Sequence, residues 1–192
     1  PCFVAASQAH AKFLKNQLGF ECRVVSHGIP LEKYPFKKDK GDYLLYLARV
    51  SEEKGALEFV RLCQAVKMRG ILVGPDDAVS DQIYYPRLVM EACSASNGLV
   101  WYYGQAGNNE EKVELLQNAR CLVSPLKAPY IEIFGMALVE AMACGTPILV
   151  TDQGAPRELV VHGVTGAVVR DFTCLEEGLK IALECEPAAC RK

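Results

Sequence analysis

The chain has 192 residues, a formal net charge of −2 and a hydrophobic content of 51%. This length suits one well-cored α/β domain and is short for two. The near-balanced charge, without a basic stripe carrying interleaved aromatic residues, gives no reason to expect nucleic-acid binding. No apolar run approaches the roughly 18 residues that span a bilayer, and no charged-then-apolar leader is visible, so we expect a cytoplasmic protein.

Short β-like runs alternate with helix-like stretches along the chain. This alternation predicts an α/β fold with a Rossmann-like parallel sheet and helices on both faces. We expect strands at residues 3–6, 23–26, 43–48, 70–73, 99–103, 121–124, 148–151 and 166–169. We expect helices at residues 9–18, 56–67, 82–95, 109–119, 136–144, 156–162 and 175–184.

Residues 31–42, with Pro30 just before them, combine prolines, a charge run and a glycine, which indicates a linker. We therefore expect a strand-helix-strand crossover segment at 1–30 and a Rossmann-like domain at 43–192. The basic run at 37–40 is interpreted as a solvated part of the linker, in preference to a membrane-surface patch.

The nine cysteines form no Cys-x-x-Cys pair and no Cys/His grouping with zinc spacing, so we expect no metal site. Four of them fall in apolar segments and are expected to be small buried residues in a reducing compartment: Cys63, Cys93, Cys121 and Cys144. Cys185 and Cys190 are the first pair to check for a disulfide.

The most informative segment carries two carboxylates, Glu132 and Glu140, eight positions apart around a Phe-Gly turn that opens a helix. Eight helical steps rise about 12 Å, so we expect Glu132 in the preceding loop and Glu140 on the early helical turns. The two acids would then serve different parts of one extended ligand. Gly135 can leave the first backbone N–H groups of the helix accessible to an anion such as a diphosphate.

A second element, Arg49 followed by Lys54-Gly55, lies between a strand-like run and a helix. An anion such as a diphosphate, bound at the start of the helix after Gly135, would need cations or a metal ion nearby to stabilise its negative charge. No Asp-x-Asp metal motif is present. Arg49 and Lys54 are therefore the candidate cations.

These two elements follow His27-Gly28-Ile29 in a fixed order. Together they resemble the C-terminal half of the retaining, GT-B-fold glycosyltransferases of family 4, from about Phe3 to Asp171. Such enzymes commonly have Asn-Gly-Ile-Asp where this chain has His27 and Pro30. They commonly have Glu-Gly-Phe-Gly where this chain has Ile133 after the first Glu, which changes the sugar pocket and keeps the Phe-Gly turn.

The resemblance implies one half of a GT-B fold that binds a nucleoside-diphosphate sugar without a metal or other cofactor. It implies catalytic roles for Arg49, Lys54 and Glu132. By the same resemblance, Glu140 takes the ribose and Glu132 the hydroxyls of the transferred sugar. The backbone along the sugar and diphosphate would come from Ile133, Phe134, Gly135, Met136 and Ala137.

The base would lie at the carboxyl ends of neighbouring strands, where Gly74 and Tyr103 stand. For Tyr103, a backbone contact with the base and simple packing both remain open. Ser7 matches a serine that often follows the strand near the domain crossover, but a helix N-cap is the favoured interpretation.

The expected partners are the nucleotide sugar and an N-terminal Rossmann-like domain of the same enzyme, through which peripheral membrane association would occur. Two alternatives stay open. One is a sugar-nucleotide epimerase of GT-B architecture, which free sugar-nucleotide isomers formed without an acceptor would reveal. The other is a nucleotide-binding module without turnover.

Overall fold

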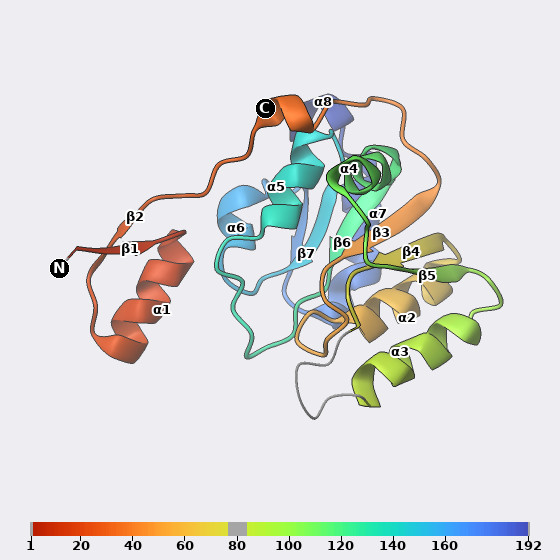
Figure 1. Ribbon diagram of the computed structural model, residues 1–192, viewed down its shortest axis with the longest axis horizontal. Coiled ribbons are helices and arrows are strands. Elements are labelled where there is room, and N and C mark those ends of the chain that lie inside the picture. Colours follow the sequence, from red (N-terminus) through yellow and green to blue (C-terminus); the bar gives the residue numbers. More distant parts are fainter. Residues whose placement is uncertain (1, 77–83, 192) are drawn as a thin grey trace.

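The structure is a computed structural model that describes residues 2–76 and 84–191 (Figure 1). Within these residues, six parallel strands form the main sheet in the order β5-β4-β3-β6-β7-β8. The strands are β3 (Tyr43–Leu47), β4 (Arg69–Val73), β5 (Val100–Gly104), β6 (Cys121–Ser124), β7 (Ile148–Thr151) and β8 (Gly166–Val169). The covering helices are α2 (Ala56–Val66), α3 (Tyr84–Ser94), α4 (Asn109–Asn118), α5 (Met136–Ala143), α6 (Pro156–Leu159) and α7 (Leu175–Glu184).

The order of the strands is that of a doubly wound Rossmann sheet. The chain runs outward from β3 through β4 to β5, then returns to the other side of β3 and continues through β6, β7 and β8. The direction of winding therefore reverses between β3 and β6. In open parallel sheets, ligands bind beyond the carboxyl ends of the strands at such a reversal.

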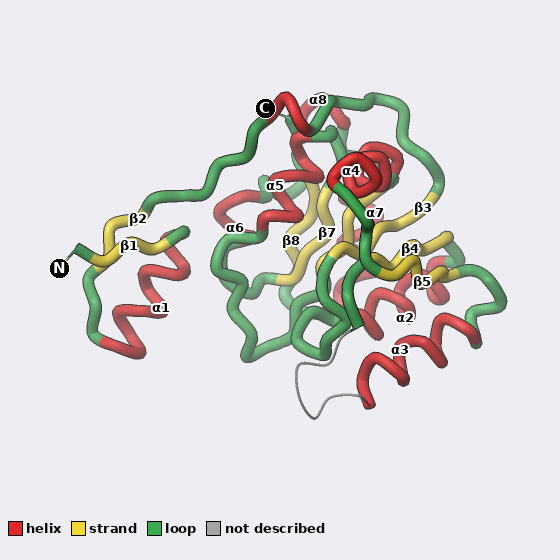
Figure 2. The backbone as a smooth tube through the Cα atoms, in the orientation of Figure 1, coloured by secondary structure: helices red, strands yellow, loops and turns green. Residues whose placement is uncertain are grey.

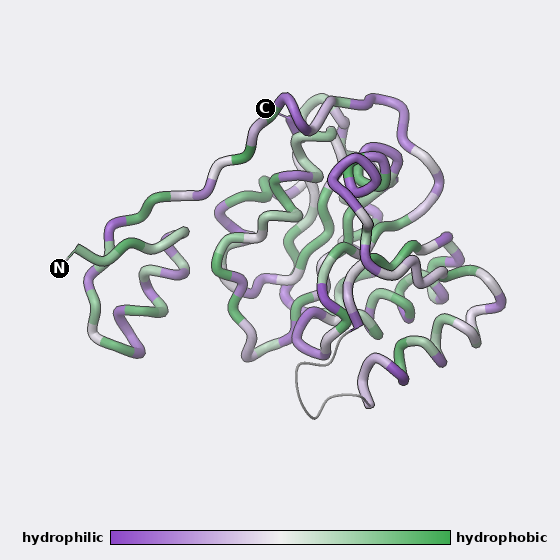
Figure 3. The backbone as a smooth tube through the Cα atoms, viewed as in Figure 1, coloured by the Kyte–Doolittle hydropathy of each residue, from purple (hydrophilic) through white to green (hydrophobic). Residues whose placement is uncertain are grey.

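Side chains of the strands alternate between the two faces of the sheet and form a hydrophobic core on each face. Leu44 and Tyr46 of β3 pack with α2, α3 and α7 on one face, whereas Leu45 packs with α4 and α5 on the other. Figure 2 shows the strands as a layer between these helices, and Figure 3 shows hydrophobic colouring along the central strands. Both faces are covered, which is why these strands read as nearly continuous apolar runs.

The first residues form a separate unit of β1 (Phe3–Ala5), α1 (Gln8–Leu18) and β2 (Cys22–Val24). β1 and β2 pair in parallel as a two-stranded sheet, and α1 has no buried residue. Figure 1 shows this unit beside the main body, joined to β3 by a long connection over α5. Ser7 caps α1 by accepting a hydrogen bond from the His10 amide at 3.0 Å, which confirms the N-cap interpretation.

The unit contacts the main body through polar groups at the start of α1. The Glu158 carboxylate accepts hydrogen bonds from the Gln8 and Ala9 amides at 2.8 and 2.7 Å. The Ser7 hydroxyl, besides capping α1, donates to the carbonyl oxygen of Ile133 at 2.6 Å. The Ser7 contact places the N-terminal end of α1 against the segment that carries Glu132, and the Glu158 contacts place it against α6.

The expected strands and helices are present, and most of their ends agree within two residues. Residues 82 and 83 of the expected 82–95 helix lie outside the described residues. The expected 156–162 helix was too long, since α6 ends at Leu159 and Val160 is already extended. The Thr165 hydroxyl accepts from the Val161 amide at 2.9 Å, which holds the turn into β8. Three short helices were not anticipated: η1 (Leu31–Lys33), η2 (Phe172–Cys174) and α8 (Pro187–Cys190).

The basic run at 37–40 is solvated only in part, since Lys38 and Asp39 are exposed whereas Lys37 and Lys40 are partly buried. Lys40 Nζ donates to the carbonyls of Gln117 and Cys144 at 3.1 and 2.8 Å and to Thr146 Oγ1 at 3.0 Å. Lys37 Nζ donates to Asn118 at 2.6 Å. Two of its three lysines therefore attach the connection to the end of α5 and to α4.

All nine cysteines are free thiols, Cys185 and Cys190 included. The four expected in the core are buried: Cys63, Cys93, Cys121 and Cys144. No helix among the described residues is long and apolar enough to cross a membrane.

Candidate functional site

A cavity of about 380 Å³ opens where β3 and β6 end and α5 begins, at the reversal of the sheet. It brings together eight of the residues expected from the sequence: Arg49, Lys54, Glu132, Ile133, Phe134, Gly135, Met136 and Ala137. His27, Leu47, Ala48, Ser124 and Leu138 complete the lining.

The turn that carries Arg49 and Lys54 is fixed at both ends. The Tyr46 hydroxyl donates to the Arg49 carbonyl at 2.6 Å, and Val50 N donates to Pro75 O at 2.9 Å. Gly55 has φ +72°, and a Cβ there would lie 1.9 Å from the Pro125 carbonyl oxygen. Only glycine fits at position 55, because the turn approaches the chain after β6 closely there.

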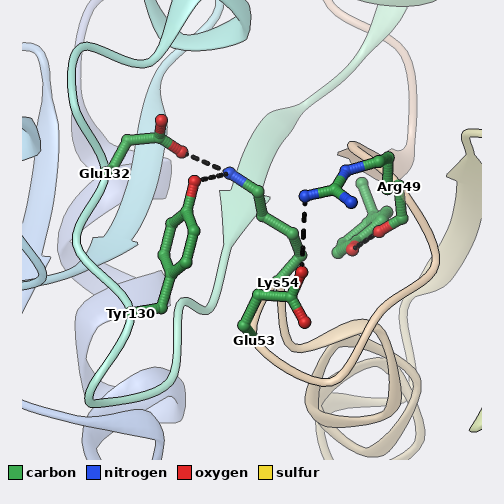
Figure 4. A network of polar contacts seen from close by, with 6 residues as sticks. Arg49, Glu53, Lys54, Tyr130 and Glu132 are labelled. Carbon is green, nitrogen blue, oxygen red and sulfur yellow. Dashed lines mark hydrogen bonds and ion pairs between the residues drawn. The ribbon is translucent and has the colours of Figure 1, made fainter. Parts of the chain in front are cut away.

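Lys54 joins this turn to the Glu132 segment (Figure 4). Its Nζ lies 2.6 Å from Glu132 Oε2 and 2.7 Å from the Tyr130 hydroxyl, and 4.3 Å from the centre of the Tyr130 ring. The side chains of Lys54 and Glu132 are only 13% and 17% exposed. In such surroundings a charge-assisted hydrogen bond is stronger than on an open surface.

Arg49 is held more loosely. Its guanidinium lies 3.4 Å from Glu53 Oε1, and 59% of its side chain is exposed. Figure 4 shows it beside Lys54, on the opposite side from Glu132. The guanidinium is thus free to turn toward an anion in the cavity.

Glu132 is placed by its backbone. Its N–H donates to Gln153 O at 2.9 Å, and its carbonyl accepts from Ala155 N at 2.9 Å. A Cβ on Gly154, which has φ +96°, would lie 2.5 Å from the Glu132 carbonyl oxygen. Glu132 therefore forms an isolated parallel β-bridge with Gly154, in the chain after β7. The Glu132 side chain is directed at Lys54.

α5 begins immediately after Gly135, whose φ of +93° turns the chain into the helix. No described residue accepts a hydrogen bond from the backbone N–H groups of Gly135, Met136 or Ala137. These groups lie in the cavity wall together with Arg49 and Lys54. Unpaired amides at a helix N-terminus and two nearby cations make this end of the cavity suited to an anion.

Glu140, one and a half turns into α5, lies outside the cavity lining and is 7% exposed. Its Oε1 accepts from the Tyr34 hydroxyl at 2.7 Å and from Lys112 Nζ at 2.8 Å. Burial opposes the charge of Lys112, yet the hydrogen bonds to Glu140 and Tyr34 raise its pKa above the ordinary value. The two glutamates thus face different surroundings, as their spacing predicted.

Gly74 and Tyr103 also lie outside this cavity. Gly74 follows β4 with φ +151°, and a Cβ there would lie 1.7 Å from the Ala48 carbonyl oxygen, so it packs against the backbone of the cavity wall. The Tyr103 hydroxyl binds Glu111, and its ring meets Trp101 edge-on at 5.1 Å between centroids. The Tyr103 side chain is thus occupied by contacts within the protein. Its backbone lies near the end of β5.

Four residues that sequence reasoning did not assign to the site contribute here. His27 lines the cavity and meets Phe134 edge-on at 5.2 Å between centroids. Tyr130 holds Lys54, while Tyr34 and Lys112 hold Glu140. Only for His27 did the sequence offer a sign of its place in the site, because it belongs to the His27-Gly28-Ile29 element. The other contacts join segments far apart in the chain, so spacing along the sequence carried no sign of them.

Comparisons with known proteins identify the family of the chain. The family described as glycosyl transferases group 1 matches residues 31–191. An α-1,3-N-acetylgalactosaminyltransferase of Campylobacter jejuni, acting on N,N'-diacetylbacillosaminyl-diphospho-undecaprenol by its name, is 29% identical over 211 residues, covering 96% of this chain and 51% of that protein. Sucrose synthase 5 of Oryza sativa is 45% identical over 51 residues, 27% of this chain and 6% of that protein.

Solved structures show the same fold. HepE of Anabaena in complex with UDP and glucose superposes with a TM-score of 0.80 at 20% identity, covering 99% of this chain and 57% of that one. Sucrose-phosphate synthase from Thermosynechococcus elongatus gives a TM-score of 0.82 at 24% identity, covering 99% and 50%. The chain therefore has the fold of one Rossmann-like half of a GT-B protein, and spans about half the length of these proteins.

Proposed function

The chain belongs to the glycosyl transferases group 1, and we propose that it is the donor-binding domain of a retaining, metal-independent glycosyltransferase of family 4. In this proposal, the whole enzyme moves a sugar from a nucleoside-diphosphate sugar to an acceptor. The observation that carries the proposal is the convergence of Arg49, Lys54 and the unpaired amides of α5 on one cavity at the sheet reversal.

The departing diphosphate gains negative charge as the bond to the sugar breaks. Cations and amides fixed before the reaction stabilise that charge without reorganising. Lys54 is already held by Glu132 and Tyr130, and Arg49 lies beside it. We assign both to the diphosphate, which removes the need for a metal ion.

The contacts with the sugar, the ribose and the base are assigned from the positions of the remaining residues relative to the diphosphate. Glu132 lies in the cavity and is assigned to the hydroxyls of the transferred sugar, with the backbone of residues 133–137 beside the sugar and diphosphate. Glu140, deeper along α5, is assigned to the ribose. Gly74 and the backbone of Tyr103, at the ends of β4 and β5, are assigned to the base.

The other half of the enzyme would extend the small sheet of β1 and β2. A two-stranded sheet is marginal by itself. Phe3 and Val4 of this sheet and Val25 just after it are exposed apolar residues, at 38%, 55% and 61%. The Campylobacter jejuni relative and the two solved structures named above are also about twice as long as this chain. We propose that an N-terminal Rossmann-like domain covers these side chains and supplies the acceptor side.

Calorimetric titration with UDP-, GDP- and ADP-sugars in excess chelator tests the proposal. One of these donors should bind, and chelator should leave its affinity nearly unchanged. Lys54→Met should weaken binding by about 1.5–3 kcal/mol, the value of a lost charged hydrogen bond. Arg61→Met, which removes an exposed cation on α2, is the control and should bind normally.

Failure of all three donors to bind the folded chain would contradict the proposal, and so would a large loss of affinity on chelation. In the full-length enzyme, the retaining assignment is tested by the anomeric configuration of the product. An inverted configuration would refute that part alone.

A further inference from the structure

The carboxylate of Glu140 is held on one side only. Both of its protein partners, the Tyr34 hydroxyl at 2.7 Å and Lys112 Nζ at 2.8 Å, contact the same oxygen, Oε1. No described residue donates a hydrogen bond to Oε2, and Oε2 is not among the buried polar atoms left without a partner. One oxygen is therefore fixed by the protein, and the other remains open to an outside donor.

The three groups form a closed triangle built from three separate parts of the chain. Lys112 Nζ lies 3.3 Å from the Tyr34 hydroxyl and 5.4 Å from the centre of the Tyr34 ring. Tyr34 follows η1 in the connection between the two sheets and is itself buried, Lys112 lies in the first turns of α4, and Glu140 lies on α5. Two anchored donors on Oε1 restrict the rotation of the carboxylate.

Restricted rotation of the carboxylate fixes the position of Oε2, which matters for recognition of a sugar hydroxyl. A hydroxyl donates a strong hydrogen bond to a carboxylate oxygen when that oxygen lies at the required distance and angle. A freely rotating carboxylate would first have to lose its rotational freedom, which weakens binding. A fixed Oε2 avoids that loss.

We infer that Lys112 and Tyr34 are positioning residues that aim Glu140 Oε2 at a ribose hydroxyl and thereby give the site its preference for ribonucleotides over 2′-deoxyribonucleotides. This inference rests on the proposed function, since it takes Glu140 as the group that binds the ribose. It adds two residues, from α4 and from the connection before β3, to the recognition of the nucleoside.

The test compares two ligands that differ only at the ribose. Dissociation constants are measured for whichever of UDP, GDP and ADP binds best and for its 2′-deoxy counterpart. The unmodified chain should prefer the ribonucleotide by about ten-fold or more, the value of one charged hydrogen bond. Lys112→Met and Tyr34→Phe should each lower this ratio toward one by weakening the ribonucleotide and sparing the 2′-deoxy ligand.

Two further variants separate positioning from general damage. Lys112→Arg keeps a cation that can donate to Oε1 and should restore most of the ratio. Lys180→Met removes an exposed lysine from α7 and should leave both constants unchanged. Thermal unfolding of each variant shows that the chain is folded when binding is measured.

The outcomes distinguish this inference from the function on which it rests. If Lys112→Met and Tyr34→Phe weaken both ligands equally, or leave the ratio unchanged, the inference is wrong while the proposed function stands. A normal chain that binds the ribonucleotide without any preference would overturn the role of Glu140 and the inference together. Absence of nucleotide binding by the normal chain would refute the proposed function, and the inference with it.

Discussion

Lys54 is the residue on which most of the site depends. It is mostly buried and hydrogen-bonded to Glu132 and Tyr130, so its ammonium is already aimed into the cavity before any ligand arrives. Glu132 also competes for it, because an anionic ligand must share the ammonium with this carboxylate. Glu140 lies apart from Lys54 and is held by Tyr34 and Lys112. The two glutamates are therefore expected to have different roles in binding.

The first prediction separates those roles. Glu140→Gln should weaken free nucleoside diphosphate and the intact sugar nucleotide alike, by about 1.5–3 kcal/mol, because a charged hydrogen bond to the ribose is lost. Glu132→Gln should spare the free nucleotide, because Lys54 keeps Tyr130 and is released from an ion pair. The loss should appear only with the sugar nucleotide, and in the full-length enzyme as lower turnover.

Calorimetry with both ligands checks this prediction. Equal weakening of the free nucleoside diphosphate by the two variants would contradict the division of roles. So would unchanged binding of both ligands by both folded variants.

At the scale of elements, α5 is tied to distant segments of the chain at its C-terminal end. Its start is set by Gly135, and its end is bound by cations from distant segments. Lys40 reaches the Cys144 carbonyl at 2.8 Å, and Arg191 reaches the Ala143 carbonyl at 2.7 Å. Cations at a helix C-terminus satisfy its last carbonyls and complement its dipole. These contacts hold in place the helix whose start faces the ligand.

The second prediction follows from that arrangement. Lys40→Met should lower the free energy of unfolding by about 1–2 kcal/mol, because the carbonyls of Gln117 and Cys144 and the Thr146 hydroxyl each lose a hydrogen bond from Lys40 Nζ. Lys38→Met is the matched control from the same connection, since Lys38 is exposed and makes no ion pair with any described residue. Urea denaturation measures both variants. Equal stability of the two would show that the contacts of Lys40 contribute nothing.

The same element shows what sequence reasoning could and could not recover. The start of α5 and the separate surroundings of Glu132 and Glu140 followed from helical spacing and from the Phe-Gly turn. The half-buried position of Lys40 did not, because a run of lysines in a connecting segment gives no local sign of the carbonyl oxygens that it will contact. Tyr130, Tyr34 and Lys112 were missed for the same reason, since the chain brings their partners from 28 to 106 residues away.

At the scale of the whole molecule, the chain divides into the small β1–α1–β2 unit and the six-stranded body. Of the residues that line the cavity, all except His27 belong to the body. The unit contacts the Glu132 segment through the Ser7 hydroxyl at Ile133 O, and α6 through Glu158. The body should therefore hold the nucleotide largely unaided.

The third prediction is that residues 31–192 fold alone and bind the same nucleotide. The dissociation constant should rise by no more than about ten-fold, which corresponds to the loss of a hydrogen bond and of the contact from His27. Circular dichroism and calorimetry check the folding and the affinity. A shortened chain that folds but binds no nucleotide would show that the small unit supplies an essential part of the site.

The position of a bound nucleotide tests the central claim most directly. A crystal structure of the chain with the best-binding nucleoside-diphosphate sugar should show the diphosphate within hydrogen-bonding distance of Lys54, Arg49 and the amides at the start of α5. It should also show the ribose at Glu140 Oε2 and the sugar beside Glu132. A diphosphate bound away from Lys54 and the α5 amides, or held to the protein chiefly through a metal ion, would contradict the account.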